Sequence, residues 1–247
     1  MQVAVFGLLP GHRFPLECTM GYLLLSNGVP IGYGGASALF KQVNTGINIF
    51  DEFRHSEAAF LWTQVMRVYH ALTGCTRFIA NAYQFGGDNA EALKSGAFWF
   101  YYRLGFRPVD VKVRALARSE SARIRRDKRY RSNVKTLRRL ASCDMHLTLP
   151  GARQGDFFDE RWFDTVSLLA TRSLAAAGPA ARRRSASLDP IAAAVPTEGW
   201  SPADKRLTQK LLRAKAGAQE LPYAKLLARH DKLLISLKKA CRRAEIG

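Results

Sequence analysis

Two tyrosines just before a glycine are the first residues whose types and spacing could do chemistry. Residues 95–108 read SGAFWFYYRLGFRP, with five consecutive aromatic residues that include Tyr101 and Tyr102, followed by Gly105. Glycine adopts the left-handed conformation at a helix end without steric cost, so Gly105 is predicted to end a helix. A tyrosine that faces a reacting group can act as a general acid, whereas most tyrosines in such a run pack in a core. The residues alone leave both roles open.

A second stretch, residues 54–59 with the sequence RHSEAA, could bind a phosphate group. It lies between a predicted strand and a predicted helix. A helix N-terminus offers an anion unpaired backbone N–H groups and the positive end of the helix dipole. The small side chains of Ala58 and Ala59 would let a ligand approach the backbone, and Arg54 would add a positive charge. The alternative is an ordinary helix start that Ser56 caps, with Arg54 in solvent.

Polar residues at the ends of two predicted strands could bind a substrate or take a proton from it. A general base must lie within hydrogen-bond reach of the proton that it takes. Asp51 and Glu52 end the predicted strand 46–53 on opposite faces, so at most one of them faces a cleft, and we choose Glu52. The next predicted strand, 77–83, leads into residues that we predict to bind substrate: Asn81, Tyr83 and Gln84.

The elements that must position these residues are a mixture of strands and helices. Residues 21–35 predict a hairpin that turns at Asn27-Gly28, because both residues tolerate a positive φ. The elements after the strand 46–53 are predicted at these positions: a helix over 56–72, a strand over 77–83, a helix over 88–105 that Asp88 and Glu91 cap, and a strand over 107–117. We therefore expect an α+β fold, in which helices flank a central mixed sheet.

The chain is predicted to consist of four parts. They are an irregular segment at 1–20, the α+β core at 21–117, a basic helical insertion with a returning strand at 118–150, and a helical region at 151–247. A flexible linker is predicted near 175–202, because this stretch is rich in Ala, Pro and Arg.

The positive charge is concentrated in the second half of the chain. The net charge is +18, and residues 116–247 contain 28 Lys and Arg against 13 Asp and Glu. Residues 118–139 are predicted to make at most weak, non-specific contacts with nucleic acid. The alternative is a solvated face or a loosely ordered arm. Stacking on single-stranded nucleic acid is not predicted, because Tyr130 is the only aromatic residue there.

No metal site and no membrane segment are predicted. The four cysteines lie far apart and form no C-x-x-C pair. No apolar run approaches the roughly 18 to 20 residues that span a bilayer, and the start lacks the basic region of a secretory signal. We therefore expect a cytoplasmic protein with unpaired thiols.

The aromatic run resembles a motif of the GNAT superfamily, the acyl-CoA-dependent N-acyltransferases. Residues 100–106, FYYRLGF, match its F-Y-x-K/R-x-G-F, and residues 83–108 are similar to a subgroup of uncharacterised bacterial GNAT-like proteins. Arg54 and Ala59 match the first and last positions of the superfamily's pyrophosphate loop, R/Q-x-x-G-x-G/A. Glu57 stands where that loop has its first glycine.

The resemblance, which covers roughly residues 20–115, implies a cofactor and a reaction. Acetyl-CoA or another acyl-CoA would place its thioester in the splay between the strands 46–53 and 77–83. An amine of a small molecule or a protein would attack the thioester, and Tyr101 would protonate the departing thiolate. The pyrophosphate would bind at the start of the helix, on Arg54, His55, Ser56, Glu57, Ala58, Ala59 and Phe60.

Two other functions stay open. The carboxylate of Glu57 would repel a pyrophosphate, and only about twenty residues precede the hairpin, where the superfamily places a strand and two helices. The chain could therefore be a catalytically inactive GNAT-like module that binds CoA or another protein. The third hypothesis is a nucleic-acid-associated protein that acts through its basic half.

Overall fold

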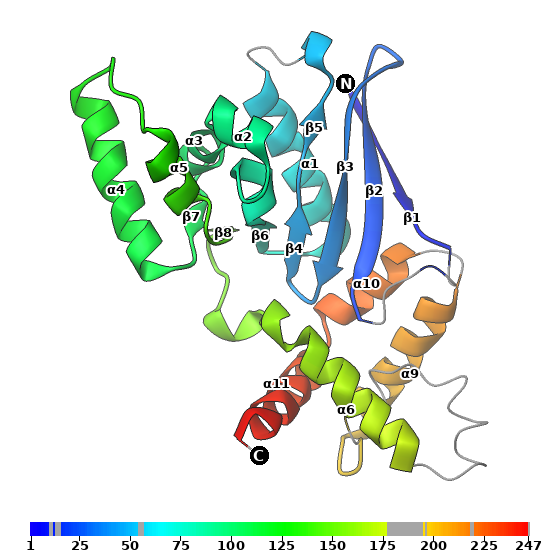
Figure 1. The fold of residues 1–247 in the computed structure, drawn as a ribbon. Helices are drawn as coiled ribbons and strands as arrows, with labels where there is room; N and C mark the ends of the chain where they lie inside the picture. The colour runs from blue at the N-terminus through cyan, green and yellow to red at the C-terminus, as the bar shows by residue number, and fades with distance from the viewer. Residues whose placement is uncertain are drawn as a thin grey trace.

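The protein has an α+β fold, as the sequence predicts. The computed structural model describes residues 1–9, 12, 16–53, 57–176, 195, 197–217 and 220–246. Within these residues it contains a mixed eight-stranded open sheet and nine α-helices (Figure 1). The strands are β1 (Gln2–Gly7), β2 (Cys18–Ser26), β3 (Val29–Leu39), β4 (Gln42–Thr45), β5 (Asn48–Ile49), β6 (Arg77–Ala80), β7 (Arg107–Pro108) and β8 (Met145–Thr148). The helices are α1 (Ala58–Thr73), α2 (Ala90–Ser95), α3 (Ala97–Arg103), α4 (Val111–Arg126), α5 (Val134–Leu140), α6 (Phe163–Ala176), α9 (Pro202–Ala216), α10 (Glu220–Ala228) and α11 (Asp231–Ile246).

The sheet is antiparallel except at one pair of strands. Its order is β1-β2-β3-β4-β6-β8-β7, and β5 pairs with β3. β4 and β6 run parallel, with α1 in the connection between them. The hairpin of β2 and β3 turns at Asn27 and Gly28, whose φ values of 50° and 82° confirm the predicted turn. The strand predicted to return within 118–150 is also confirmed, because β8 pairs with β6.

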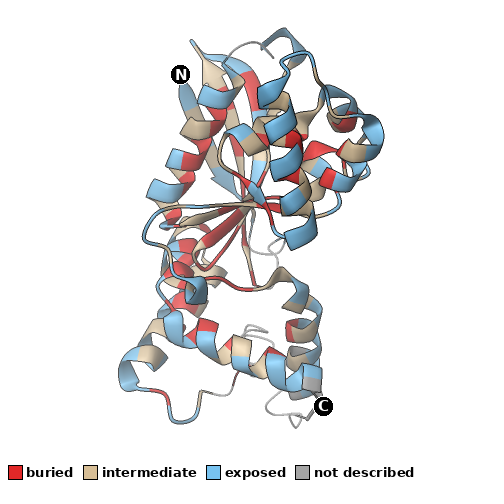
Figure 2. Cartoon of the chain, turned by 90° about the vertical axis from the view of Figure 1, so that its left-hand side faces the viewer, coloured by how far each residue is buried: buried red, intermediate tan, exposed pale blue. Residues whose placement is uncertain are grey.

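One face of the sheet packs against α1. Every second residue of β2 is buried on that face, namely Cys18, Met20, Tyr22 and Leu24. The residues that α1 buries include Leu61, Trp62, Val65, Met66 and Tyr69. The rings of Tyr22 and Tyr69 meet edge to face, with their centroids 6.0 Å apart. Figure 2 shows the buried residues gathered along the sheet and the inner sides of the helices that cover it.

Two strand predictions in the first 53 residues are corrected. The described part of residues 1–20 is not irregular throughout, because Gln2–Gly7 form β1, which pairs with β2 along its whole length while Val3 and Val5 pack on the core. The strand predicted over 46–53 is reduced to the two residues of β5, and a short 3-10 helix follows it.

The strand predicted over 107–117 is mostly helix. β7 keeps only two residues of it, and α4 starts directly afterwards. The cause is Asp110, whose carboxylate accepts hydrogen bonds from two backbone N–H groups in the first turn of α4, at 2.8 and 2.9 Å. This N-cap favours the helix over a longer strand.

The helix predicted over 88–105 is two helices. Asn89, rather than Asp88, caps α2, and its Oδ1 accepts a hydrogen bond from Ala92 N at 3.0 Å. Gly96 then ends α2 and precedes α3 with a φ of 68°, a value that interrupts a right-handed helix. Gly105 follows α3 with a φ of 100°, which confirms the predicted helix stop.

Helix α10 ties the C-terminal helices to the sheet. Its buried residue Glu220 accepts hydrogen bonds from the backbone N–H groups of Leu8, at 2.8 Å, and Thr19, at 2.9 Å. Tyr223 donates its hydroxyl to the carbonyl oxygen of Leu16 at 2.6 Å. These bonds hold α10 against the connection between β1 and β2 (Figure 1).

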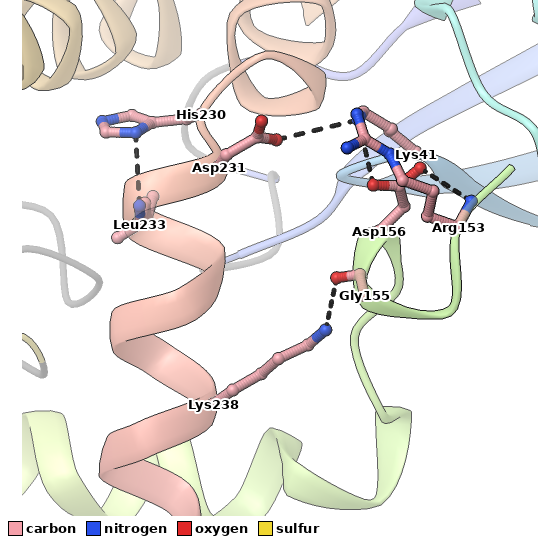
Figure 3. A network of polar contacts seen from close by, with 8 residues as sticks. All are labelled: Lys41, Arg153, Gly155, Asp156, His230, Asp231, Leu233 and Lys238. Atoms are coloured by element: carbon pink, nitrogen blue, oxygen red, sulfur yellow. Dashed lines mark hydrogen bonds and ion pairs between the residues drawn. The ribbon is translucent and has the colours of Figure 1, made fainter.

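A polar network ties α11 to the end of the sheet (Figure 3). Lys41, between β3 and β4, forms ion pairs with Asp156 at 3.2 Å and with Asp231 at 3.7 Å. Lys238 on α11 donates to the carbonyl oxygen of Gly155 at 2.6 Å. Lys41 thus joins the end of the sheet to α11 and to the segment before α6, and Lys238 joins these two elements to each other. These C-terminal elements therefore pack on the core.

The linker predicted near 175–202 lies mostly outside the described residues. None of the helices that the structure describes has both the length and the apolar content needed to cross a membrane. In the same described ranges, no group of three or more His, Cys, Asp or Glu side chains is placed to hold a metal ion.

Candidate functional site

A cavity lies where the two parallel strands part. β4 and β6 pair from Gln42 with Arg77 as far as Asn44 with Ile79. Beyond this point β4 stays paired with β3, while the chain after β6 turns into a 3-10 helix at Ala82–Phe85. The cavity, with a volume of about 990 Å³, is lined by residues from both sides of this division.

The walls of the cavity come from strands and helices. Five consecutive residues of β3, 33–37, line it. Residues of α2 and α3 line it as well, among them Glu91 and Tyr101. Ala58 places the start of α1 at the cavity.

The side chain of Tyr22 reaches across β3 to the backbone of Gly46, which lines the cavity. It is fully buried on β2, opposite Gly34 of β3, and its hydroxyl donates to the carbonyl oxygen of Gly46 at 2.6 Å. A Cβ at Gly34 would lie 2.4 Å from both that hydroxyl and that carbonyl oxygen. Only glycine at position 34 therefore leaves room for the tyrosine to reach across β3.

Gln84 connects Gly46 with Tyr101. A Cβ at Gly46 would lie 2.3 Å from Oε1 of Gln84, so the side-chain amide of Gln84 occupies the space next to the Gly46 backbone. The hydroxyl of Tyr101 donates to the same Oε1 at 3.4 Å. The end of β4, the segment after β6 and α3 thus meet at one polar group.

Tyr101 is the most deeply buried tyrosine of the aromatic run. Its side chain is 3% exposed, and rings contact it from α1, from the segment after β6 and from beyond α3: Trp62, Phe85 and Phe106. Burial raises the pKa of the Tyr101 hydroxyl, so the group carries its proton at neutral pH. A tyrosine in this state can donate a hydrogen bond or a proton to a group in the cavity.

Several residues predicted from the sequence line the cavity together. They are Ala58, Asn81, Tyr83, Gln84 and Tyr101. These residues belong to three segments that are well separated in the sequence, so the predicted acid and the predicted substrate-binding residues share one site. Three predicted cofactor-binding residues, Arg54, His55 and Ser56, lie outside the described residues.

The other predicted residues lie beside the cavity or away from it. Glu57 directly precedes α1, and its side chain makes no capping hydrogen bond. Neither Glu57 nor Ala59 nor Phe60 is among the described residues that line the cavity, and Phe60 is 55% exposed. Glu52 is exposed in the 3-10 helix Asp51–Phe53 and is also absent from the described lining. The predicted base is therefore not brought together with Tyr101.

Two polar atoms of the cavity wall have no hydrogen-bond partner among the described residues. They are Oδ1 of Asn81 and Oγ1 of Thr19, and both atoms are buried. Buried polar atoms have hydrogen-bond partners in most native structures, so a buried polar atom without a partner in a cavity wall indicates where a ligand could form a hydrogen bond. Oδ1 of Asn81 only accepts hydrogen bonds, so it fits the N–H group of an amide or an amine.

A half-buried carboxylate, that of Glu160, lies behind the cavity wall. Its oxygens accept hydrogen bonds from Gln42 Nε2 and from Asn44 Nδ2, both at 3.4 Å, and Asn44 lines the cavity. Burial raises the pKa of Glu160, and the nearby carboxylates of Asp144 and Glu17 raise it further. Sequence reasoning missed Glu160, because it lies 116 residues from Asn44 and nothing in its neighbourhood along the chain marks it.

Comparison of the chain with protein-family models, with curated proteins and with solved structures found no match.

Proposed function

We propose that the protein is an acyl-CoA-dependent N-acyltransferase whose active site is the cavity between β4 and β6. The observation that carries the proposal is the place of Tyr101. This tyrosine, four residues before the helix-ending Gly105, lines the cavity at the point where the parallel strands part. That is the position at which the resemblance to GNAT proteins expects the general acid next to the thioester.

The cavity is large enough for a sizeable cofactor. Its volume of about 990 Å³ lies at the upper end of the range for small-molecule sites, about 300 to 1,000 Å³. The start of α1 reaches it at Ala58, so the positive end of the helix dipole is available to a pyrophosphate. Oδ1 of Asn81 and the amide of Gln84 would hold the N–H and C=O groups of an acyl-pantetheine arm.

The reaction needs one proton donor at the leaving sulfur. The amine nitrogen forms a bond with the thioester carbonyl carbon, the C–S bond breaks, and the nitrogen releases its proton to water. Tyr101 gives its proton to the departing thiolate and regains one from solvent. A backbone N–H group where β4 and β6 part would stabilise the negative charge on the carbonyl oxygen. Glu52 has no role in this scheme.

One observation favours a second candidate, a module that binds CoA or a protein without catalysis. Glu57 directly precedes α1 and makes no capping bond that would turn its charge away from the start of the helix. A carboxylate there opposes the binding of a pyrophosphate. This candidate lacks the chemical step and could also bind CoA weakly, so binding and turnover must be measured separately.

The test is calorimetry with acetyl-CoA and longer acyl-CoAs, followed by a thiol-release assay with a panel of small primary amines and lysine peptides. Binding together with amine-dependent release of CoA supports the enzyme. Binding without release by any amine supports the inactive CoA-binding module, and no binding to any acyl-CoA overturns both the enzyme and the CoA-binding module. A cytoplasmic location fits either function, because Cys18, Cys75, Cys143 and Cys241 form no disulfide bonds.

A further inference from the structure

We propose that residues 111–139 form a rigid surface that binds the phosphate backbone of double-stranded nucleic acid. This surface, here named the basic hairpin, consists of α4, the loop 127–133 and the greater part of α5. It contains 12 Lys and Arg against two acidic residues, and all the cationic side chains except Arg114 are exposed. The proposal is independent of the acyltransferase function. In Figure 1, α4 lies at the margin of the molecule, far from α9 and α10.

Both acidic residues of the basic hairpin accept hydrogen bonds within it, Glu120 as a buried residue and Asp127 as an exposed one. Glu120 is 3% exposed, and its carboxylate accepts hydrogen bonds from Arg123 at 3.0 Å, Tyr130 at 2.8 Å and Ser132 at 2.6 Å. Asp127 accepts a hydrogen bond from the backbone N–H of Arg129 at 2.8 Å. The negative charges are therefore used to fold the hairpin, and the positive charges stay on its outside.

The bonds to Glu120 also fix the loop. Tyr130 is held at its hydroxyl by Glu120, and the guanidinium of Arg123 lies over its ring at 4.2 Å. Asn133 ends the loop by capping α5, where its Oδ1 accepts from Thr136 N at 2.9 Å. A pre-organised loop loses less conformational entropy when it binds, so its cations contribute more to affinity than those of a free arm.

Three features select double-stranded nucleic acid among polyanions. Eight of the eleven exposed cations are arginines, whose planar guanidinium groups match phosphate oxygens. The only aromatic ring, that of Tyr130, is already covered by Arg123, so no platform is left for the stacked bases of a single strand. The residues Val113, Leu116 and Ala117 pack on the protein core, so this apolar side of α4 cannot enter a membrane.

The test measures binding by the full chain. Fluorescence anisotropy is recorded with a labelled 20-base-pair duplex as RNA and as DNA, with the single strands, and with phosphatidylserine vesicles, at several salt concentrations. We expect both duplexes to bind more tightly than the single strands, with an affinity that falls steeply with salt. Tighter binding of the RNA duplex or of the DNA duplex identifies the source of the phosphates. Binding to vesicles alone, or to none of these ligands at low salt, overturns the proposal.

A triple variant and a matched control show which surface binds. Replacing Arg125, Arg126 and Arg129 by Glu changes the charge by the same amount as replacing Lys205, Arg206 and Lys210 by Glu on α9, and all six side chains are exposed. We expect the first variant to lose about tenfold or more in duplex affinity and to show a smaller salt slope, and the second to lose much less. Equal losses would mean that net charge alone attracts the duplex and would overturn the proposal.

The role of the fixed loop is tested with a variant for which the change in net charge and the loss of the loop's anchor predict opposite changes in duplex affinity. Glu120→Gln raises the net charge by one unit, so simple electrostatic attraction predicts tighter binding. We expect weaker binding, because the loop loses its anchor. Tyr130→Phe removes only the hydrogen bond to Glu120 and should weaken binding in the same direction without a change of charge. Tighter binding by the first variant together with unchanged binding by the second would overturn the role of the loop.

Discussion

The side-chain amide of Gln84 lies directly against the backbone of Gly46. The contact is so close that a Cβ at position 46 would come within 2.3 Å of Oε1, 2.4 Å of Cδ and 2.5 Å of Nε2. The carbonyl of the same glycine accepts the hydroxyl of Tyr22 at 2.6 Å. Gly46 is therefore the point at which β4, the segment after β6 and the core side of β2 meet.

Gly46→Ala should change the site more than the fold. The new methyl group must displace the side-chain amide of Gln84, and with it the acceptor of the Tyr101 hydroxyl. Because the displaced atoms are the end of a flexible side chain, we expect a loss in the free energy of unfolding at the low end of the about 1–3 kcal/mol that is usual for overpacking, measured by denaturant titration, together with weaker binding of acyl-CoA by calorimetry. The control is Gly35→Ala, where a Cβ meets nothing within 4 Å although the residue also lines the cavity. Equal affinities of the two variants for acyl-CoA would contradict the close contact.

Tyr101→Phe should separate chemistry from binding. The variant keeps the buried ring and loses only the hydroxyl, so the fold and the affinity for acyl-CoA should change little. We expect the turnover number in the thiol-release assay to fall by about 10² to 10⁴, the usual effect of removing an acid-base group. Tyr102→Phe is the control, because this neighbour is not among the described residues that line the cavity. Turnover like that of the wild type in Tyr101→Phe would remove Tyr101 from the mechanism.

Tyr22→Phe should destabilise the protein through the Gly46 carbonyl. The side chain of Tyr22 is fully buried, and its hydroxyl reaches this group over Gly34. Without it the carbonyl loses this partner, which costs about 1–3 kcal/mol for a buried group. Thermal and denaturant unfolding should show this loss relative to Tyr33→Phe, whose side chain is 49% exposed. The same stability in both variants would mean that the carbonyl finds another partner.

Local patterns in the sequence predict the elements well, because they depend on neighbouring residues. The turn at Asn27-Gly28 and the helix stop at Gly105 follow from the backbone freedom of the residues themselves, and both are present. The predicted strand 46–53 is shorter: the Gly46 carbonyl bonds to the Tyr22 hydroxyl, and residues 51–53 form a 3-10 helix. Glu52, which that strand would have placed at the cavity, is therefore exposed in a 3-10 helix.

The candidate site depends on contacts that no local pattern records. Composition and spacing allow either a packing role or a chemical role for Tyr101, and only the resemblance to a family motif favours the chemical role. The contact of Gln84 with Gly46 brings together the segments that follow β6 and β4, and α1 separates these segments in the sequence. Glu160 reaches Asn44 across 116 residues. Such contacts form only when the sheet is assembled. The sequence could therefore predict residues such as Asn81 and Tyr101 at the cavity, but not Asn44 on β4 or Gly46 directly after it.

The pH dependence of stability should report on His146, which lies on β8 between β6 and β7. Burial lowers the pKa of this histidine to about 4, with help from the charges of Arg77 and Arg114, while Asp159 opposes the shift. In the folded protein His146 therefore takes up its proton at a lower pH than in the unfolded chain, where the pKa of the histidine is near 6.5. The stability that neutral His146 contributes is complete above pH 6.5 and is lost as the pH falls to about 4. We expect the wild type to lose about 3 kcal/mol relative to His146→Gln over this interval, measured by denaturant unfolding at each pH. Parallel pH profiles for the two proteins would show that the imidazole is hydrated in the folded state.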